Sequence, residues 1–240
     1  MTAIIWCNLP RKLGGMKFLL AVCAAATLAM SAQTIRCTFT ASDSPLVLDP
    51  KSGFWKDAPM AGFHHDSFGK DTGLKPTEVR VRWSEQFLYV LFVGPYAVMH
   101  LKPQPVTDRD TVPLWDWDVA ELFIGSDFHN IQRYKEFEVS PQGEWVDLDV
   151  RKDLDEFDWK WNSGFEPAAR IDREARVWYA GMKIPWKSID GVEATAGREY
   201  RVNFYRIEGP APTRKFLAWQ PTKSASYHVP EEFGRMMLVQ

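Results

Sequence analysis

Aromatic rings and carboxylates alternate in one short stretch of this 240-residue sequence, Leu114 to Phe123. Trp115 and Glu121 share parity along it, so an extended strand would place both side chains on one face. A carboxylate among apolar neighbours must be paired or hydrogen-bonded, because burying it bare is costly. Two interpretations follow: Glu121 forms a buried ion pair with an arginine, or it accepts hydrogen bonds from ligand hydroxyl groups beside a stacking ring.

Glycoside hydrolysis is one chemistry that carboxylates could perform here, since it needs two of them at a controlled separation. The candidates are Asp116, Asp118, Glu121, Glu136 and Glu138. Surface solvation or strand pairing explains most of them without catalysis, and a small sandwich lacks a long cleft built by loops. We therefore expect no catalytic residues, and keep a hydrolase, or association with one, as the alternative.

Haem binding is a second alternative, because related sandwiches hold haem through methionine and histidine. The candidate ligands are His64, His65, His100, His129, His228, Met60 and Met99. The sequence contains no Cys-x-x-Cys-His attachment motif. It also lacks the Gly-x-Ser-x-Gly turn that carries a nucleophilic serine, so no catalytic triad is indicated.

Short strands separated by turns must position these side chains. Thr77–Trp83 alternates apolar and polar residues, as a half-buried strand does, and Leu88–Val93 is apolar on both faces, as a central strand is. Further strands are predicted at Asp118–Ile124, Tyr134–Val139, Trp145–Val150, Arg176–Ile184 and Glu199–Arg206. Pro185–Ile189 predicts a single helical turn. The pattern indicates an all-β protein, a single antiparallel β-sandwich of jelly-roll-like type.

Composition fits a folded β protein and excludes other classes. The 29 basic and 31 acidic residues give a net charge of −2, whereas a nucleic-acid binder would show a strong basic excess. The 11 Trp, 7 Tyr and 15 Phe favour strands and sites that grip flat apolar surfaces. Three cysteines cannot supply a disulfide framework.

The first 32 residues have the order of a secretory signal peptide. Basic residues precede an apolar run from Phe18 to Met30, which is too short to span a bilayer comfortably, and Ser31 and Ala32 follow. An uncleaved anchor is the alternative, and Met16 is a second candidate start. We expect a secreted (periplasmic or extracellular) protein without a membrane span after cleavage. Residues 33–43 are then an N-terminal linker, and residues 44–240 form the sandwich.

Several motifs occur in a specific order along the sandwich. They are Glu78-Val79-Arg80-Val81-Arg82-Trp83, Leu88-Tyr89-Val90, the Trp-x-x-Asp-x-x-Glu-x-Phe pattern over Trp115–Phe123, Tyr134-Lys135-Glu136-Phe137-Glu138-Val139-Ser140-Pro141-Gln142-Gly143, Met182-Lys183-Ile184-Pro185-Trp186, Trp219-Gln220-Pro221 and His228-Val229-Pro230-Glu231-Glu232-Phe233-Gly234. In this order the chain resembles a family 9 carbohydrate-binding module in its broader, family 9-like form, over roughly residues 44–238.

The resemblance implies an antiparallel β-sandwich that binds the end of a glycan chain between two tryptophan rings. Trp115 matches the first ring and Glu121 matches an acid that hydrogen-bonds the ligand. Trp219 is the candidate second ring, and Lys135 is a candidate polar contact. The rival rings, expected in the core, are Trp161, Trp178 and Trp186. The family often carries calcium, so structural calcium is the one cofactor considered, with its ligands unassigned.

The implied function is that of an exported, non-catalytic carbohydrate-binding protein in polysaccharide catabolism. Its expected partner is a carbohydrate ligand, with no role for nucleic acid. Modules of this family often serve an attached catalytic domain, and this sequence has no room for one beside the sandwich. A separately encoded glycoside hydrolase is therefore the candidate enzyme partner. The alternatives are a free-standing sugar-binding protein and a module that has lost its sugar site and acts in assembly.

Overall fold

The computed structural model describes residues 32–240, which form one folded unit built almost entirely of strands. Apart from its last residue, Ala32, the predicted signal peptide lies outside the described residues, as does the alternative start Met16. Within residues 32–240, no helix is long and apolar enough to cross a membrane.

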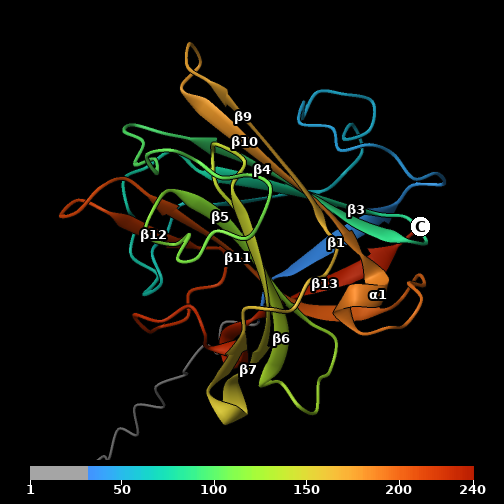
Figure 1. Cartoon of the computed structure of the whole chain (residues 1–240). Coiled ribbons are helices and arrows are strands. Elements are labelled where there is room, and N and C mark those ends of the chain that lie inside the picture. The colour runs from blue at the N-terminus through green and yellow to red at the C-terminus, as the bar shows by residue number, and fades with distance from the viewer. Residues whose placement is uncertain (1–31) are drawn as a thin grey trace, which may run out of the picture. The chain divides into compact units, whose positions relative to one another are not determined.

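Thirteen strands make up the fold of the described residues (Figure 1). They are β1 (Thr34–Phe39), β2 (Met60–Phe63), β3 (Thr77–Trp83), β4 (Phe87–Pro95), β5 (Val119–Gly125), β6 (Arg133–Val139), β7 (Trp145–Arg151), β8 (Glu156–Asp158), β9 (Glu166–Asp172), β10 (Val177–Pro185), β11 (Glu199–Glu208), β12 (Lys215–Ala218) and β13 (Gly234–Val239). The helical elements are the single turn α1 (Trp186–Ile189) and the 3-10 turns η1 (Lys152–Leu154) and η2 (Pro230–Glu232). Every strand predicted from the sequence is present, as is the helical turn.

The strands pair in the order β8-β7-β6-β5-β11-β13-β1-β3-β4-β10-β9, with β12 beside β11 and β2 beside β3. The sheet curls so that its two ends pack as opposed layers, which confirms the predicted all-β sandwich. Pairing is antiparallel except at β1, which runs parallel to both β13 and β3. Consecutive strands such as β3–β4, β6–β7 and β9–β10 pair as hairpins, whereas β5–β11, β4–β10 and β11–β13 are antiparallel pairs of strands distant in the chain. Strand β1 pairs with β13, the strand that ends the chain.

The prediction of a linker over residues 33–43 is wrong, because Thr34–Phe39 is strand β1 in the middle of the sheet. Ile35 and Cys37 are buried in the core, and Cys37 is a free thiol. The alternation of these apolar residues with polar ones is a strand signal, although a short one. The strand is stabilised by partners some 200 residues away in the chain, which local sequence does not reveal.

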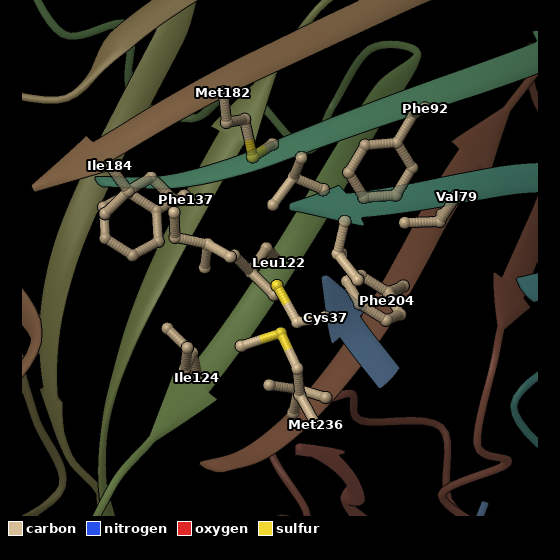
Figure 2. Packing of buried hydrophobic residues seen from close by; sticks show 14 of the residues in the cluster. Cys37, Val79, Phe92, Leu122, Ile124, Phe137, Met182, Ile184, Phe204 and Met236 are labelled. Atoms are coloured by element: carbon tan, nitrogen blue, oxygen red, sulfur yellow. The ribbon is translucent and has the colours of Figure 1, made fainter. Parts of the chain in front are cut away.

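The core lies between the two layers of the sandwich (Figure 2). Leu122 of β5 and Phe137 of β6 come from one layer, and Phe92 of β4 and Met182 of β10 come from the other. All four side chains are at most 1% exposed. Because successive residues of a strand point to opposite faces, the residues between them on β5 and β6 must point away from this core.

Those alternate residues form a second apolar cluster on the outer face of β5, β6, β7 and β11. It contains Leu114, Val119, Phe123, Tyr134, Val146, Leu148, Val150, Tyr205, Ile207, Ala218, Tyr227 and Phe233. Strand β5 is consequently buried on both faces along its whole length. Strands β8 and β12 flank this outer face within the sheet, and the chain between Trp219 and Phe233 covers it.

Candidate functional site

A pocket of about 360 Å³ opens on the outer face of β5 and β6. The strands supply its polar end, and the covering segments supply most of its aromatic wall. The lining residues are Trp115, Glu121, Phe123, Glu136, Glu138, Phe157, Trp159, Ile207, Phe216, Ala225, Ser226, Tyr227 and His228. Concave sites with mostly apolar walls and a few converging polar groups are the usual form of small-molecule sites.

Two indoles form one wall of the pocket. Trp115 lies in the turn before β5 and is half-buried, and Trp159 follows β8 and is 40% exposed. Their ring centroids are 5.4 Å apart with the planes tilted by 36°. Arg214 fixes the turn, because its guanidinium donates hydrogen bonds to the backbone carbonyls of residues 115–117. The wall thus combines one anchored ring with one accessible ring.

Three carboxylates form the polar end of the pocket. Glu121 of β5 lies directly opposite Glu138 of β6 in the strand register, and Glu136 lies two residues before Glu138 on the same face. One oxygen from each side chain lies within 4.8 Å of the others, and the three residues are only 1–4% exposed. Like charges directly opposite each other in a sheet are destabilising. The strand register therefore places three acids where the fold alone would disfavour them.

Burial raises the pKa of all three carboxyl groups, and repulsion between them adds to the effect for Glu121 and Glu138. The pKa of Glu136 is raised to about 7, chiefly by burial. His228 lies beside the cluster, with its Nδ1 4.0 Å from Glu136 and 2.8 Å from the Tyr134 hydroxyl. Burial lowers the pKa of His228 to about 4, so its ring is neutral at pH 7. The polar end of the pocket is therefore acidic, with protons held on some of its carboxyl groups near neutrality.

The structure brings Trp115 and Glu121 into this one pocket. The ion pair considered for Glu121 is not found among the described residues, since no lysine, arginine or histidine lies within 4.0 Å of its carboxylate. Arg214 is the basic group that acts on it through its charge, and that guanidinium is bonded to backbone carbonyls. Glu121 lines the pocket, and its Oε1 is buried without a hydrogen-bond partner among the described residues.

The prediction that Trp219 is the second ring of the site, opposite Trp115, is wrong. Trp219 is only 4% exposed and packs in the inner core, with its ring 5.3 Å from that of Phe204. Its backbone N–H donates to the Phe204 carbonyl, so the chain keeps a strand-like path past the end of β12. Trp219 is two residues after Leu217 on this extended path, so both side chains lie on the same face and point into the inner core. The second ring of the pocket is Trp159.

Lys135 does not contact the pocket. It alternates with Glu136 on β6 and so points to the opposite face. There its Nζ lies 2.6 Å from Asp149 Oδ1 and 4.5 Å from the centroid of the Trp161 ring. The predicted polar contact between Lys135 and a ligand in this pocket is therefore wrong.

The rival tryptophans lie where the sequence predicted them. Trp178 and Trp186 are 1% exposed in the inner core, and Trp161 packs against that core. Trp159 was missed, although it lies in a long loop-like stretch, where binding residues are common. A second missed signal is the alternation Glu136-x-Glu138, which puts two acids on one face of a strand.

The remaining candidates for chemistry lie elsewhere. Asp116 is exposed, and Asp118 accepts hydrogen bonds from the backbone amides of Gly209 and His100. Burial raises the pKa of Asp118 to about 6. Of the histidines and methionines considered as haem ligands, only His228 lines the pocket, so the described residues offer no histidine–methionine pair there. For a metal ion, the described residues offer one group of three acids with suitable spacing, which is the cluster in this pocket.

Known proteins share this fold. A protein from Bacteroides uniformis ATCC 8492, proposed to bind carbohydrate, aligns over 87% of this chain and 100% of its own, with a TM-score of 0.71 and 16% identity. A family 9 carbohydrate-binding module from Caldicellulosiruptor kristjanssonii, solved with cellotriose, aligns over 86% of this chain and 94% of its own, with a TM-score of 0.60 and 13% identity. The same module solved with glucose has a TM-score of 0.59.

Sequence comparison points the same way. An extracellular protein of Arthroderma benhamiae is 26% identical over 140 residues, which cover 52% of this chain and 63% of that protein. The family described as "Carbohydrate family 9 binding domain-like" matches residues 53–240, nearly the whole sandwich. The chain belongs to this carbohydrate family 9 binding domain-like family.

Proposed function

We propose that this chain is an exported protein that binds the terminal sugar of a glycan in the pocket between Trp115 and Trp159, without hydrolysing it. The observation that carries the proposal is the pocket itself, an aromatic wall above buried carboxylates in a chain of a carbohydrate-binding family. The related Caldicellulosiruptor module was solved with glucose and with cellotriose, which supports a sugar as the ligand.

The chemistry of a sugar fits the two parts of this pocket. A pyranose has an apolar C–H face that an indole can cover and a belt of hydroxyl groups that carboxylates can bind. Burying about 100 Å² against each ring contributes roughly 2–3 kcal/mol. Hydrogen bonds to charged groups add about 1.5–3 kcal/mol each, and association costs several kcal/mol. We expect dissociation constants on the order of micromolar to millimolar.

The buried acids favour a chain end over the middle of a chain. Glu121, Glu136 and Glu138 are buried pocket-lining residues of strands β5 and β6, so a sugar that reaches them meets the sheet. A terminal residue can enter ring-first and leave the rest of the glycan in solvent. A separately encoded glycoside hydrolase would then be a natural partner in polysaccharide breakdown.

Binding and its site are tested together with a glycan array, followed by calorimetric titration of the best ligand. Trp159→Ala should weaken binding about 30-fold or more, because it removes one stacking surface worth roughly 2–3 kcal/mol. Trp161→Ala is the matched control, since Trp161 lies two residues away and packs toward the other face. The proposal would be overturned if no glycan on the array bound. It would also be overturned if Trp159→Ala and Trp161→Ala lost the same sugar affinity.

Export is tested separately by mass spectrometry of the protein isolated from its native cells. The signal-peptide pattern predicts a chain that begins near Gln33 and is recovered outside the cytoplasm. Recovery of the chain with Phe18 to Met30 still attached would indicate an anchor instead. A single oligosaccharide incubation also separates binding from hydrolysis, because a binding protein leaves the oligosaccharide uncut.

A further inference from the structure

The three carboxylates in the pocket have no cation opposite them in the part of the chain that the structure describes. Within 4.0 Å, the one basic side chain is His228, which lies that far from Glu136. Burial lowers the pKa of His228 to about 4, so it brings no charge at pH 7. The guanidinium of Arg214 acts on Glu121 only from a distance, since its N–H groups donate to backbone carbonyls.

These carboxylates also have unused hydrogen-bonding capacity. Glu121 Oε1, Glu136 Oε2 and Glu138 Oε2 are buried and accept no hydrogen bond from a protein donor, although their residues line an open pocket. Glu136 and Glu138 can bond each other only by sharing a proton. Buried polar atoms in native proteins are nearly always bonded, so three orphaned oxygens around one space need an explanation. A ligand that supplies hydrogen-bond donors and positive charge together would provide one.

We infer that the sugar bound here carries a primary ammonium group, as an amino sugar does, and that Glu121, Glu136 and Glu138 bind this ammonium. The inference rests on the proposed function and narrows its ligand class. An –NH₃⁺ group has three N–H donors, which matches three carboxylates whose oxygens lie within 4.8 Å of one another. Hydrogen bonds between ionised partners are stronger than neutral ones.

The aromatic wall suits the same ligand. Trp115, Phe123 and Trp159 line the pocket together with the acids. Indole and phenyl faces attract cations and also cover the apolar face of a sugar ring. A neutral sugar would use the rings equally well, but it would supply no positive charge to the acids, whose mutual repulsion is otherwise relieved only by the protons that they hold. The acids therefore distinguish a cationic sugar from a neutral one.

A bare metal ion fits the pocket less well than an ammonium group. Calcium takes six to eight oxygen ligands and magnesium takes six. Besides the three acids, the lining is mainly aromatic, and the hydroxyl of Tyr227 already donates toward the backbone of β11 and β12. A volume of about 360 Å³ is also far larger than an ion, whereas it accommodates a sugar ring.

The test is calorimetric titration of the full chain with glucosamine, glucose and N-acetylglucosamine at neutral pH. The last sugar keeps the nitrogen and removes its charge. We expect glucosamine to bind about tenfold more tightly than either neutral sugar. Glu136→Gln and Glu138→Gln should each reduce this preference to about threefold or less. Glu78→Gln on β3 is the matched control, because Glu78 is partly exposed and belongs to the other layer.

The outcomes separate this inference from the proposed function. If glucose or N-acetylglucosamine binds as tightly as glucosamine, the ammonium preference is overturned while sugar binding stands. If none of the three sugars and no glycan on the array binds, both fail. Calcium chloride that binds the wild type but not Glu136→Gln, without a preference for glucosamine, would also overturn the inference. The affinities of the wild-type chain for the three sugars are sufficient to test the preference for glucosamine. A variant that misfolds therefore leaves the inference testable.

Discussion

The two outer faces of the sandwich are covered in different ways. Over β4 and β10, a segment between Val47 and Ala58 lies against the sheet, with Trp55 fully buried and its Nε1 donating to the Val47 carbonyl at 2.7 Å. Gly181 of β10 permits this contact, because a Cβ at that position would lie 2.7 Å from a methyl carbon of Leu48. This cover is apolar and closely packed, as in the interior of a protein.

The outer face of β5 and β6 is covered with less contact. The rings above it, Trp159 and Phe216, are 40% and 44% exposed, and a pocket of about 360 Å³ remains beneath them. The strand residues under this cover include acids, whereas the strand residues under Trp55 are Tyr89, Leu91 and Val93. The difference teaches that one sheet can carry a dense apolar cover on one outer face and a loose cover over acids on the other, the face for which we propose ligand binding.

The largest effect that would test this comparison is expected from Trp55→Ala. Truncating a fully buried tryptophan costs about 3–5 kcal/mol, so the midpoint of thermal unfolding should fall by roughly 10 °C. Sugar affinity measured well below that midpoint should stay within about twofold, because Trp55 covers the other face. A marginal change in the midpoint would mean that the Val47–Ala58 cover is not part of the stable core.

An intermediate effect is expected from pH, through the acids under the loose cover. The pKa of Glu136 is raised by burial from 4.5 to about 7, so between these values the folded chain binds more protons than the unfolded one. Stability should therefore fall as pH rises through this range. The folded-state pKa values of Glu121 and Glu138 are raised as well, which gives the same sign.

Glu138→Gln removes one of these charges and should make the loss of stability with pH smaller. Burial and the neighbouring carboxyl groups raise the pKa of Glu138, so at pH 8 the variant should be more stable than the wild type. The other charged and titratable groups that face the cluster are Tyr134, Tyr205, Tyr227, His228 and Arg214. The midpoint of thermal unfolding at pH 5 and pH 8 measures the effect. An equal change in this midpoint for the wild type and the variant would contradict the prediction.

The smallest effect is expected from Trp159→Ala on stability. An exposed side chain away from the core usually changes the free energy of unfolding by no more than about 0.5 kcal/mol. The midpoint of thermal unfolding should therefore move by about 1–2 °C. A loss approaching that of Trp55→Ala would mean that both covers are structural, and the contrast between the two faces would disappear.

Much of this architecture was readable from the sequence, because strand alternation is a local property. The period of two predicted the central strands and placed Trp115 and Glu121 on the same side of the chain. It also predicted that Glu121 would lie among apolar neighbours, and the residue is 2% exposed. Trp178 and Trp186 were expected in the core as rivals of the binding rings, and they are there.

The tertiary structure decided which separate segments meet. Trp159 stands beside Trp115 because β8 pairs with β7 at the end of the sheet, and the chain that follows β8 brings the two rings into contact. The register between β5 and β6, rather than either strand alone, places Glu121 opposite Glu138. Alternation defines two faces of a strand without saying which one points inward, and Trp219 points inward because its strand-like path continues beyond β12. Partners distant in sequence settle these choices, since each depends on pairing and packing that only the folded chain brings together.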